Sequence, residues 1–281
     1  MKNPQNPPSE ARQLADFIGQ HPRLVVLTGA GISLQSGIPT YRDRNGVWLG
    51  SAPMQHQDFI THEHIRSRYW ARSFIGRSTI AAAQPNPAHF ALARLEAGGF
   101  VELLITQNVD NLHQRAGSRH VIDLHGNLRD IHCLDCAERS SRDELQQRIA
   151  ELNPHLQGLM AEIRPDGDAI LDEAHIRQVR IPECTRCGGV LMPEVVFFGG
   201  TVPVTRVQYC LDALQRADAL LVVGSSLKVY SGYRFCLRAK EWDKPIALIN
   251  PGITRADPLA ALHLKSDSST LLAQTVKLMA V

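Results

Sequence analysis

Short, unbroken apolar runs that end in glycine or polar residues constrain the fold of this chain more than any other feature. The clearest run, Leu24 to Thr28, leads directly into a glycine-containing turn. Strands without polar alternation are buried on both faces, as in a parallel sheet that helices cover on each side. Five further runs predict strands at 101–106, 121–124, 195–198, 219–223 and 245–249.

Helical patterns lie between several of these runs, at 88–97, 204–217 and 233–241, and a further short one spans 10–19. Alternating strands and helices predict an α/β protein with a doubly wound, Rossmann-like parallel sheet. Two segments interrupt the alternation, a helical insert at 49–87 and a cysteine-bearing insert at 129–192. We expect 1–48, 88–128 and 193–281 to form the sheet domain, and the two inserts to form a smaller one.

Composition excludes several classes of protein. The 30 basic residues among 281 are scattered and the net charge is only +2, which argues against nucleic acid as a partner. No apolar stretch approaches 18 residues, so no membrane span is expected. The N-terminal segment lacks the features of a signal or transit peptide, so we expect a cytoplasmic location. No feature specifies an oligomeric state.

Four of the six cysteines form two C-x-x-C pairs, Cys133 with Cys136 and Cys184 with Cys187. Four thiolates around Zn²⁺ make a closed structural site without a position for a catalytic water. The 47 residues between the pairs predict a helix of their own, at 142–151. The pattern predicts a zinc ribbon, and the remaining cysteines, Cys210 and Cys236, are expected in the core.

Glycine-rich or polar segments follow the predicted strands, where α/β sheets bind ligands. They are Gly29-Ala30-Gly31-Ile32-Ser33, Thr106-Gln107-Asn108-Val109-Asp110, His125, Gly224-Ser225-Ser226 and Asn250. Glycines and a helix N-terminus after the first strand suit a phosphate, although Leu34 replaces the third glycine of the usual dinucleotide motif. Each segment alone also fits an ordinary strand-to-helix turn, and a lone histidine is more often structural.

Together these segments resemble the sirtuin family. The shared motifs are GAGIS, SGIPTYRD, TQNVD, LHG, both C-x-x-C pairs, VVGSSL and LIN, in that order from Leu24 to Asp267. Segments at 55–59, 68–72, 84–89, 165–168 and 229–235 are similar to the class II branch of that family. The resemblance implies an NAD-dependent enzyme that removes acyl groups from protein lysines, with NAD as co-substrate and one structural zinc ion.

The resemblance also implies roles for individual residues. His125 would be the general base, with Asn108 as a second catalytic residue. NAD would be bound by residues that follow the predicted strands and by residues of the loop after Ser33. These are Gly29, Ala30, Gly31, Ser33, Pro39, Tyr41, Arg42, Gln107, Asn108, Asp110, Gly224, Ser225, Ser226 and Asn250. The substrate peptide would pair as a strand near Phe198-Gly199-Gly200, where the family commonly has FGE.

The implied chemistry begins with attack of the acyl oxygen on the nicotinamide ribose and release of nicotinamide. His125 then removes a ribose hydroxyl proton, and the products are free lysine and O-acyl-ADP-ribose. This step needs a neutral imidazole, so activity should fall at acid pH. Three alternatives stay open: a protein mono-ADP-ribosyltransferase, a zinc-ribbon module that only senses NAD, and, with less support, an NAD redox enzyme.

Tyr69 and Arg72 are candidates for contacts with the acyl group. Their i, i+3 spacing places both on one face of a predicted helix. The same Y-x-x-R pattern occurs in sirtuins that remove negatively charged acyl groups, and an arginine fork matches a carboxylate. The sequence therefore suggests a preference for long or acidic acyl chains over acetyl. A solvated salt bridge of Arg72 is the alternative.

Overall fold

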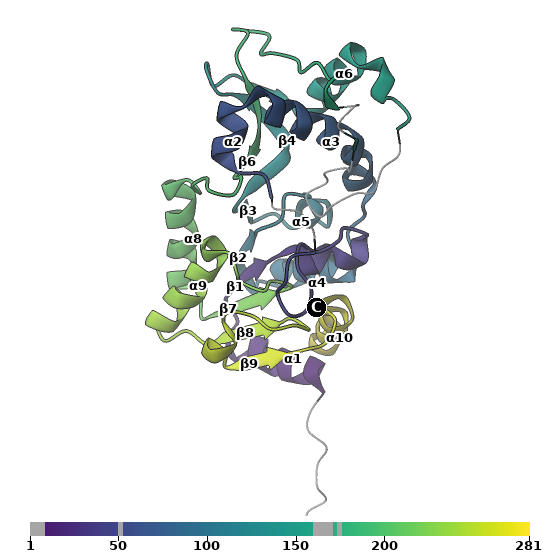
Figure 1. The fold of residues 1–281 in the computed structure, drawn as a ribbon. Coiled ribbons are helices and arrows are strands. Elements are labelled where there is room, and N and C mark those ends of the chain that lie inside the picture. Colours follow the sequence, from purple (N-terminus) through teal and green to yellow (C-terminus); the bar gives the residue numbers. More distant parts are fainter. Residues whose placement is uncertain (1–8, 50–52, 160–170, 173–175) are drawn as a thin grey trace, which may run out of the picture.

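The main body of the molecule is a six-stranded, all-parallel sheet. The computed structural model describes residues 9–49, 53–159, 171–172 and 176–281, so the motif at 165–168 lies outside the described residues. The strands are ordered β3-β2-β1-β7-β8-β9. Their bounds are Leu24–Thr28 for β1, Val101–Thr106 for β2, Val121–Asp123 for β3, Ala219–Val223 for β7, Ile246–Ile249 for β8 and Leu262–Leu264 for β9. Figure 1 shows this sheet in the lower part of the molecule.

Helices cover both faces of the sheet, which confirms the predicted fold class. One layer contains α1 (Glu10–Gln20), α4 (Pro87–Ala97) and α10 (Ser268–Met279), and the other contains α8 (Val204–Arg216) and α9 (Tyr230–Glu241). Leu24 and Val26 pack in the first layer, whereas Val25 and Leu27 pack in the second. All five residues of β1 are buried, as expected of a strand covered on both sides.

A second, smaller body stands above the sheet in Figure 1. It is built on a three-stranded antiparallel sheet ordered β5-β4-β6, namely Arg139–Ser141, Gly126–Cys133 and Leu191–Val195. Helices α2 (His56–Thr61), α3 (Glu63–Ala82) and α6 (Arg142–Leu152) pack with it. One hydrophobic cluster joins Phe59, Trp70 and Phe74 to Ile131, Leu145 and Met192. Both inserts thus contribute to the same core.

The short elements complete the description. They are the 3₁₀ helices η1 (Ala30–Ser36), η2 (Pro154–Leu156) and η3 (Asp257–Leu259) and the single-turn helix α5 (Leu112–Arg115). The helix predicted within the cysteine insert is α6, which begins at a capping box formed by Ser141 and Glu144. No helix in the described part of the chain is both long and apolar enough to cross a membrane.

The strand predicted at 195–198 is wrong. Residues 191–195 form β6, which pairs antiparallel with β4 in the small sheet, and Phe198 makes only an isolated bridge with Gln55. An apolar run shows that a strand is buried but not which sheet it joins. The sequence analysis also missed β9 at the edge of the sheet, β4 and β5, whose residues are largely polar, and α10.

Candidate active site

The carboxyl ends of the central strands converge where the strand order reverses direction. Strand β1 pairs with β2 on one side and with β7 on the other. The chain leaves β1 at Gly29, β2 at Gln107 and β7 at Gly224, so all three predicted segments meet at this edge. Such a switch point is the usual ligand-binding crevice of an open α/β sheet.

Three glycines let the turns after β1 and β7 touch. A Cβ on Gly29 would lie 2.8 Å from the Ser225 Cβ, and a Cβ on Gly31 would lie 2.9 Å from the Gly224 Cα. The Gly31 N–H donates to the Gly224 carbonyl over 2.8 Å. Gly224 itself has φ +61°, a conformation that side chains disfavour. Close backbone packing therefore requires these glycines, whether or not a phosphate also lies against them.

Ser33, Asn108 and Asp110 form one hydrogen-bonded cluster. The Ser33 hydroxyl donates to Asp110 Oδ2 over 2.7 Å, and Asn108 Nδ2 lies 3.1 Å from the Ser33 Oγ. Asp110 also accepts the Leu112 N–H over 3.0 Å. Burial raises the pKa of Asp110, while its hydrogen bonds act in the opposite direction. The structure thus brings together three predicted residues that lie up to 77 positions apart in sequence.

Gln107 ties the end of β2 to the ends of β1 and β7. Its side-chain amide donates to the Ser225 Oγ over 2.8 Å and to the Thr28 carbonyl over 3.2 Å. Ser226 contributes its carbonyl to the N–H of Arg255 over 3.0 Å. In this structure Gln107 and Ser225 satisfy one another, so a ligand there would have to replace or share that bond.

His125 follows β3 and is anchored at both ring nitrogens. Nδ1 lies 3.0 Å from the Gln107 carbonyl oxygen and Nε2 lies 2.7 Å from the Ser231 Oγ. Burial lowers the pKa of His125 to about 4, helped by the nearby Arg206 and Arg234 charges and opposed by the bond to Gln107. The imidazole is therefore neutral at physiological pH, as a general base requires.

The loop after η1 places Tyr41 and Arg42 against Trp48. The Arg42 guanidinium lies 3.9 Å from the Trp48 ring centroid, and its Nη1 donates to the Gly46 carbonyl over 2.8 Å. The Tyr41 and Trp48 rings meet edge to face at 6.1 Å. Pro39 lies on the same loop, partly exposed. Asn250, after β8, donates its side-chain amide to the Gly252 carbonyl over 2.9 Å.

Tyr69 and Arg72 lie on α3 and are both only 8% exposed. The Tyr69 ring packs on Phe59 at 5.4 Å and on Phe197 at 5.2 Å, between ring centroids. Both belong to the interior of the smaller body rather than to the edge of the parallel sheet. The alternative for Arg72 placed it on a solvated helix face, and the burial of the side chain contradicts that position.

The four predicted metal ligands form a compact cluster. The Sγ atoms of Cys133 and Cys187 are 3.5 Å apart, those of Cys136 and Cys184 are 3.7 Å apart, and all four lie within 4.8 Å of one another. A tetrahedral zinc ion with Zn–S bonds of 2.3 Å needs sulfurs about 3.8 Å apart. The cluster fits one structural zinc ion, as the spacing of the cysteines predicts.

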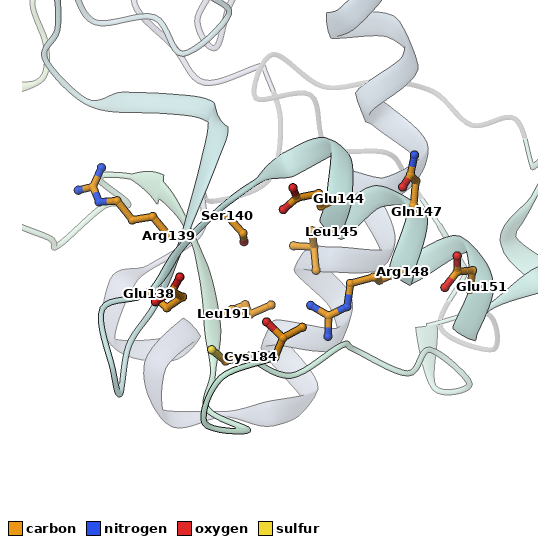
Figure 2. Close-up of a pocket in the computed structure, with 11 residues that line it drawn as sticks. Glu138, Arg139, Ser140, Glu144, Leu145, Gln147, Arg148, Glu151, Cys184 and Leu191 are labelled. Atoms are coloured by element: carbon orange, nitrogen blue, oxygen red, sulfur yellow. The ribbon is translucent and has the colours of Figure 1, made fainter.

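A pocket of about 410 Å³ lies beside this cluster, away from His125. In Figure 2, Arg148 extends from α6 toward Leu191 and the loop of Cys184, and Glu144 points toward Ser140. Arg148 donates to the Glu183 carbonyl over 2.6 Å. The lining mixes carboxylates and guanidinium groups, and it contains none of the residues expected to bind NAD.

Ser231 is the residue of this site that the sequence analysis did not single out. It lies in the first turn of α9, 106 positions from His125, and no chemical motif surrounds it. The only available signal is the segment Val229 to Phe235, which resembles class II relatives without indicating a contact.

Comparison with known proteins identifies the lineage of the chain. The model of the Sir2 family matches residues 29–231. An NAD-dependent protein deacetylase 2 of Bradyrhizobium diazoefficiens is 49% identical, with 95% of this chain and 98% of the relative covered. The NAD-dependent protein lipoamidase sirtuin-4 of Homo sapiens is 48% identical, with 94% of this chain and 85% of the relative covered.

Solved structures agree with these relatives. One described as explaining the mechanism and regulation of Sir2 enzymes has a TM-score of 0.75 at 32% identity, with 95% of this chain and 96% of that chain covered. A Sir2 complex with deacetylated p53 peptide and 3′-O-acetyl-ADP-ribose has a TM-score of 0.77 at 28% identity, with 96% and 98% covered.

Proposed function

This chain belongs to the Sir2 family and is an NAD-dependent protein deacylase, and we propose that His125 is its general base. The observation that carries the proposal is that the His125 imidazole is uncharged at neutral pH. His125 follows β3, which pairs with β2, and its ring Nδ1 lies 3.0 Å from the Gln107 carbonyl oxygen at the ligand-binding edge. Its pKa of about 4 keeps it able to accept a proton throughout the neutral range.

We propose that the cluster of Ser33, Asn108 and Asp110 binds the nicotinamide riboside part of NAD. NAD supplies the ribose carbon that receives the acyl oxygen and the nicotinamide that leaves. Hydroxyl, amide and carboxylate groups lie within one hydrogen-bonded unit, which matches the mixed donors and acceptors of a ribose and a carboxamide. Asn108 would orient the reacting ribose, while His125 takes up the hydroxyl proton.

The remaining NAD contacts extend along the same edge of the sheet. We propose that Gly29, Ala30, Gly31 and the Gly224-Ser225-Ser226 turn contact the pyrophosphate, that Asn250 contacts the adenine ribose, and that Pro39, Tyr41 and Arg42 cover the cofactor. The meeting of these segments at the switch point of the sheet supports this arrangement. Arg42 would need to exchange part of its contact with Trp48 for the cofactor.

Acyl-lysine proteins are the partners of such an enzyme, and we propose that the peptide lies beside Gly199. Phe198 already donates its N–H to the Met54 carbonyl over 3.2 Å and accepts the His56 N–H over 2.8 Å. An added peptide strand would therefore pair with the two glycines that follow Phe198. Beyond its cofactor NAD the chain carries one structural zinc ion, held by the cysteine cluster.

The division into two domains and the cellular location are further proposals. The shared hydrophobic cluster of the two inserts supports a smaller domain formed from 49–87 and 129–192. We propose that the enzyme works in the cytoplasm, because four adjacent thiolates without disulfides suit a reducing compartment.

The variant His125→Ala tests the proposed base. It should keep the fold and the affinity for ADP-ribose but lower kcat for deacylation by roughly 10²-fold or more, as expected for loss of a general base. Activity is measured by mass spectrometry of an acyl-lysine peptide with NAD, and O-acyl-ADP-ribose is followed as the product. His155→Ala, at an exposed position in η2, is the matched control. Near-normal turnover of His125→Ala would refute the role.

A further inference from the structure

We propose that Ser231 is a positioning residue for His125, because its hydroxyl binds the Nε2 lone pair and holds the ring in its proton-accepting orientation. The proposal rests on the assigned role of His125 as general base. The two atoms are 2.7 Å apart, which is a short hydrogen bond between a hydroxyl and a ring nitrogen. Ser231 lies on α9, on the opposite side of the ring from Gln107.

The partner of the other ring nitrogen fixes which way this bond runs. A backbone carbonyl only accepts hydrogen bonds, so Nδ1 must carry the proton that reaches the Gln107 carbonyl oxygen over 3.0 Å. In a neutral imidazole Nε2 then has a lone pair and no proton. The Ser231 hydroxyl is therefore the donor, and it occupies the same lone pair that must later accept the ribose proton.

The first turn of α9 is built to bring Ser231 this close. A Cβ on Gly232 would lie 2.5 Å from the Gln107 Oε1, so a larger residue there would require the Gln107 side chain to move. The same turn is closed by the Tyr233 N–H, which donates to the Val229 carbonyl over 3.2 Å. The position of Ser231 thus follows from close packing between α9 and the residue that anchors the other side of the ring.

The charges around His125 favour the neutral imidazole, as the Ser231 hydroxyl does. Arg206 comes from α8 and Arg234 from α9, and both disfavour a positive imidazolium. Arg206 Nη1 donates to the Leu124 carbonyl over 3.2 Å, next to His125 in the chain. A hydroxyl that donates to the neutral ring adds to this preference, and it is released when the ribose hydroxyl takes its place.

The test compares three substitutions at one position. Ser231→Ala removes the donor, Ser231→Cys keeps the size with a weak donor, and Ser231→Thr keeps the hydroxyl. Loss of one neutral hydrogen bond should raise the titration midpoint of His125 by roughly half to one pH unit. It should lower kcat roughly 3- to 10-fold and leave the KM for NAD within about twofold. Ser231→Thr should keep the titration midpoint and the kcat close to those of the wild type.

Two readouts make the outcome decisive. The ring ¹⁵N shifts of His125, assigned with His125→Ala, are followed from pH 8 to about pH 3, so that the range includes the midpoint near 4. The kcat/KM is measured over the part of this range in which the protein stays folded. Lys240→Ala, exposed near the end of α9, is the control. An unchanged midpoint and pH profile in Ser231→Ala would overturn the proposal while His125→Ala is still inactive. If His125→Ala were active, the assignment of the base itself would fail instead.

Discussion

Arg72 is a charged side chain held almost entirely out of water. It is 8% exposed, in the same hydrophobic surroundings as the aromatic rings of Tyr69 and Trp70. A guanidinium is retained in such a place when it is paired or serves a ligand. Its role in acyl selection is a prediction from the sequence. Because Arg72 is buried, any substitution also disturbs packing, so the test has to separate loss of acyl selection from loss of stability.

Substitution of Arg72 by methionine distinguishes a role in the choice of acyl group from a role in packing the smaller body. If the guanidinium binds an acidic acyl chain, Arg72→Met should cost roughly 10- to 100-fold on glutaryl peptides, the equivalent of about 1.5–3 kcal/mol for a charged hydrogen bond. Acetyl peptide has no carboxylate to lose and should be affected little. The measurement is kcat/KM for a panel of acyl peptides.

A second buried arginine provides the matched control. Arg142, 2% exposed, lies over the Trp70 ring at 5.4 Å in the same body. Arg142→Met should lower the melting temperature and slow every acyl chain alike. A wild type that prefers acetyl, or an Arg72→Met variant that behaves like Arg142→Met, would make Arg72 a structural residue.

Much of the candidate site was predictable at this scale because its residues follow strands and match a family pattern. The structure adds physical reasons that no motif contains. Gly29 and Gly31 are needed where two turns touch, and Asp110 is bound by a serine 77 positions away. Ser231 was not predictable, because its hydrogen bond to His125 forms only when α9 packs against the segment that follows β3, 106 positions earlier in the chain.

The zinc ribbon is the element whose formation depends most on a bound ion. Cys133 and Cys184 carry two of the four sulfurs and also belong to the hydrophobic cluster of the smaller body. The two knuckles are closed by backbone bonds, Ala137 N–H to the Cys133 carbonyl at 3.0 Å and Gly188 N–H to the Cys184 carbonyl at 2.9 Å. Metal binding and packing of this core are therefore coupled.

Cys184→Ala should remove the zinc ion and destabilise the protein. Purified wild type should contain one zinc ion per chain, and the variant well below one. Loss of a structural metal is among the largest single-site effects, so the melting temperature should fall by roughly 10 °C. Metal analysis by mass spectrometry and thermal unfolding are the measurements. Cys210→Ala, in the core of the sheet domain, should lose stability but keep its zinc. Active protein without zinc would contradict the assignment.

Elements of the parallel sheet were predicted better than those of the smaller body. Buried runs such as Leu24–Thr28 and Ala219–Val223 are apolar throughout, so sequence alone defines them. Strand β4 contains Asn127, Arg129 and Asp130, and it is held in the small sheet by pairing rather than by composition. A polar strand of this kind gives no periodic signal, and the neighbouring apolar run at 195–198 was consequently assigned to the wrong sheet.

At the scale of the whole molecule, buried histidines make the fold sensitive to acid. His89 and His125 both have a pKa of about 4, and burial lowers the pKa of His113 well below its usual value. In the unfolded chain histidine titrates near 6.5. Between these values the unfolded state binds more protons, so stability is retained above about pH 6.5 and is lost as the pH falls toward 4.

The free energy of unfolding should therefore decrease steeply between pH 6.5 and pH 4. For His89 and for His125, a pKa lowered from 6.5 to about 4 contributes about 3 kcal/mol each to the free energy of unfolding at neutral pH. Urea unfolding followed across this range measures the loss. His89→Gln should flatten the dependence, whereas an exposed histidine replaced in the same way, at His155, should leave it unchanged. A flat profile for the wild type would contradict the neutral burial of these side chains.

The pairing of β1 with β7 has a consequence for synthesis. Leu24 lies beside Ala219 in the finished sheet, so one side of the central strand stays unpaired until the ribosome has delivered almost 200 further residues. The partner on the other side, β2, arrives much earlier. The zinc-bearing insert is translated within this interval and can assemble first. The cofactor edge, which needs both neighbours of β1, can only be completed late, so nascent chains that stop before 219 should be inert toward NAD.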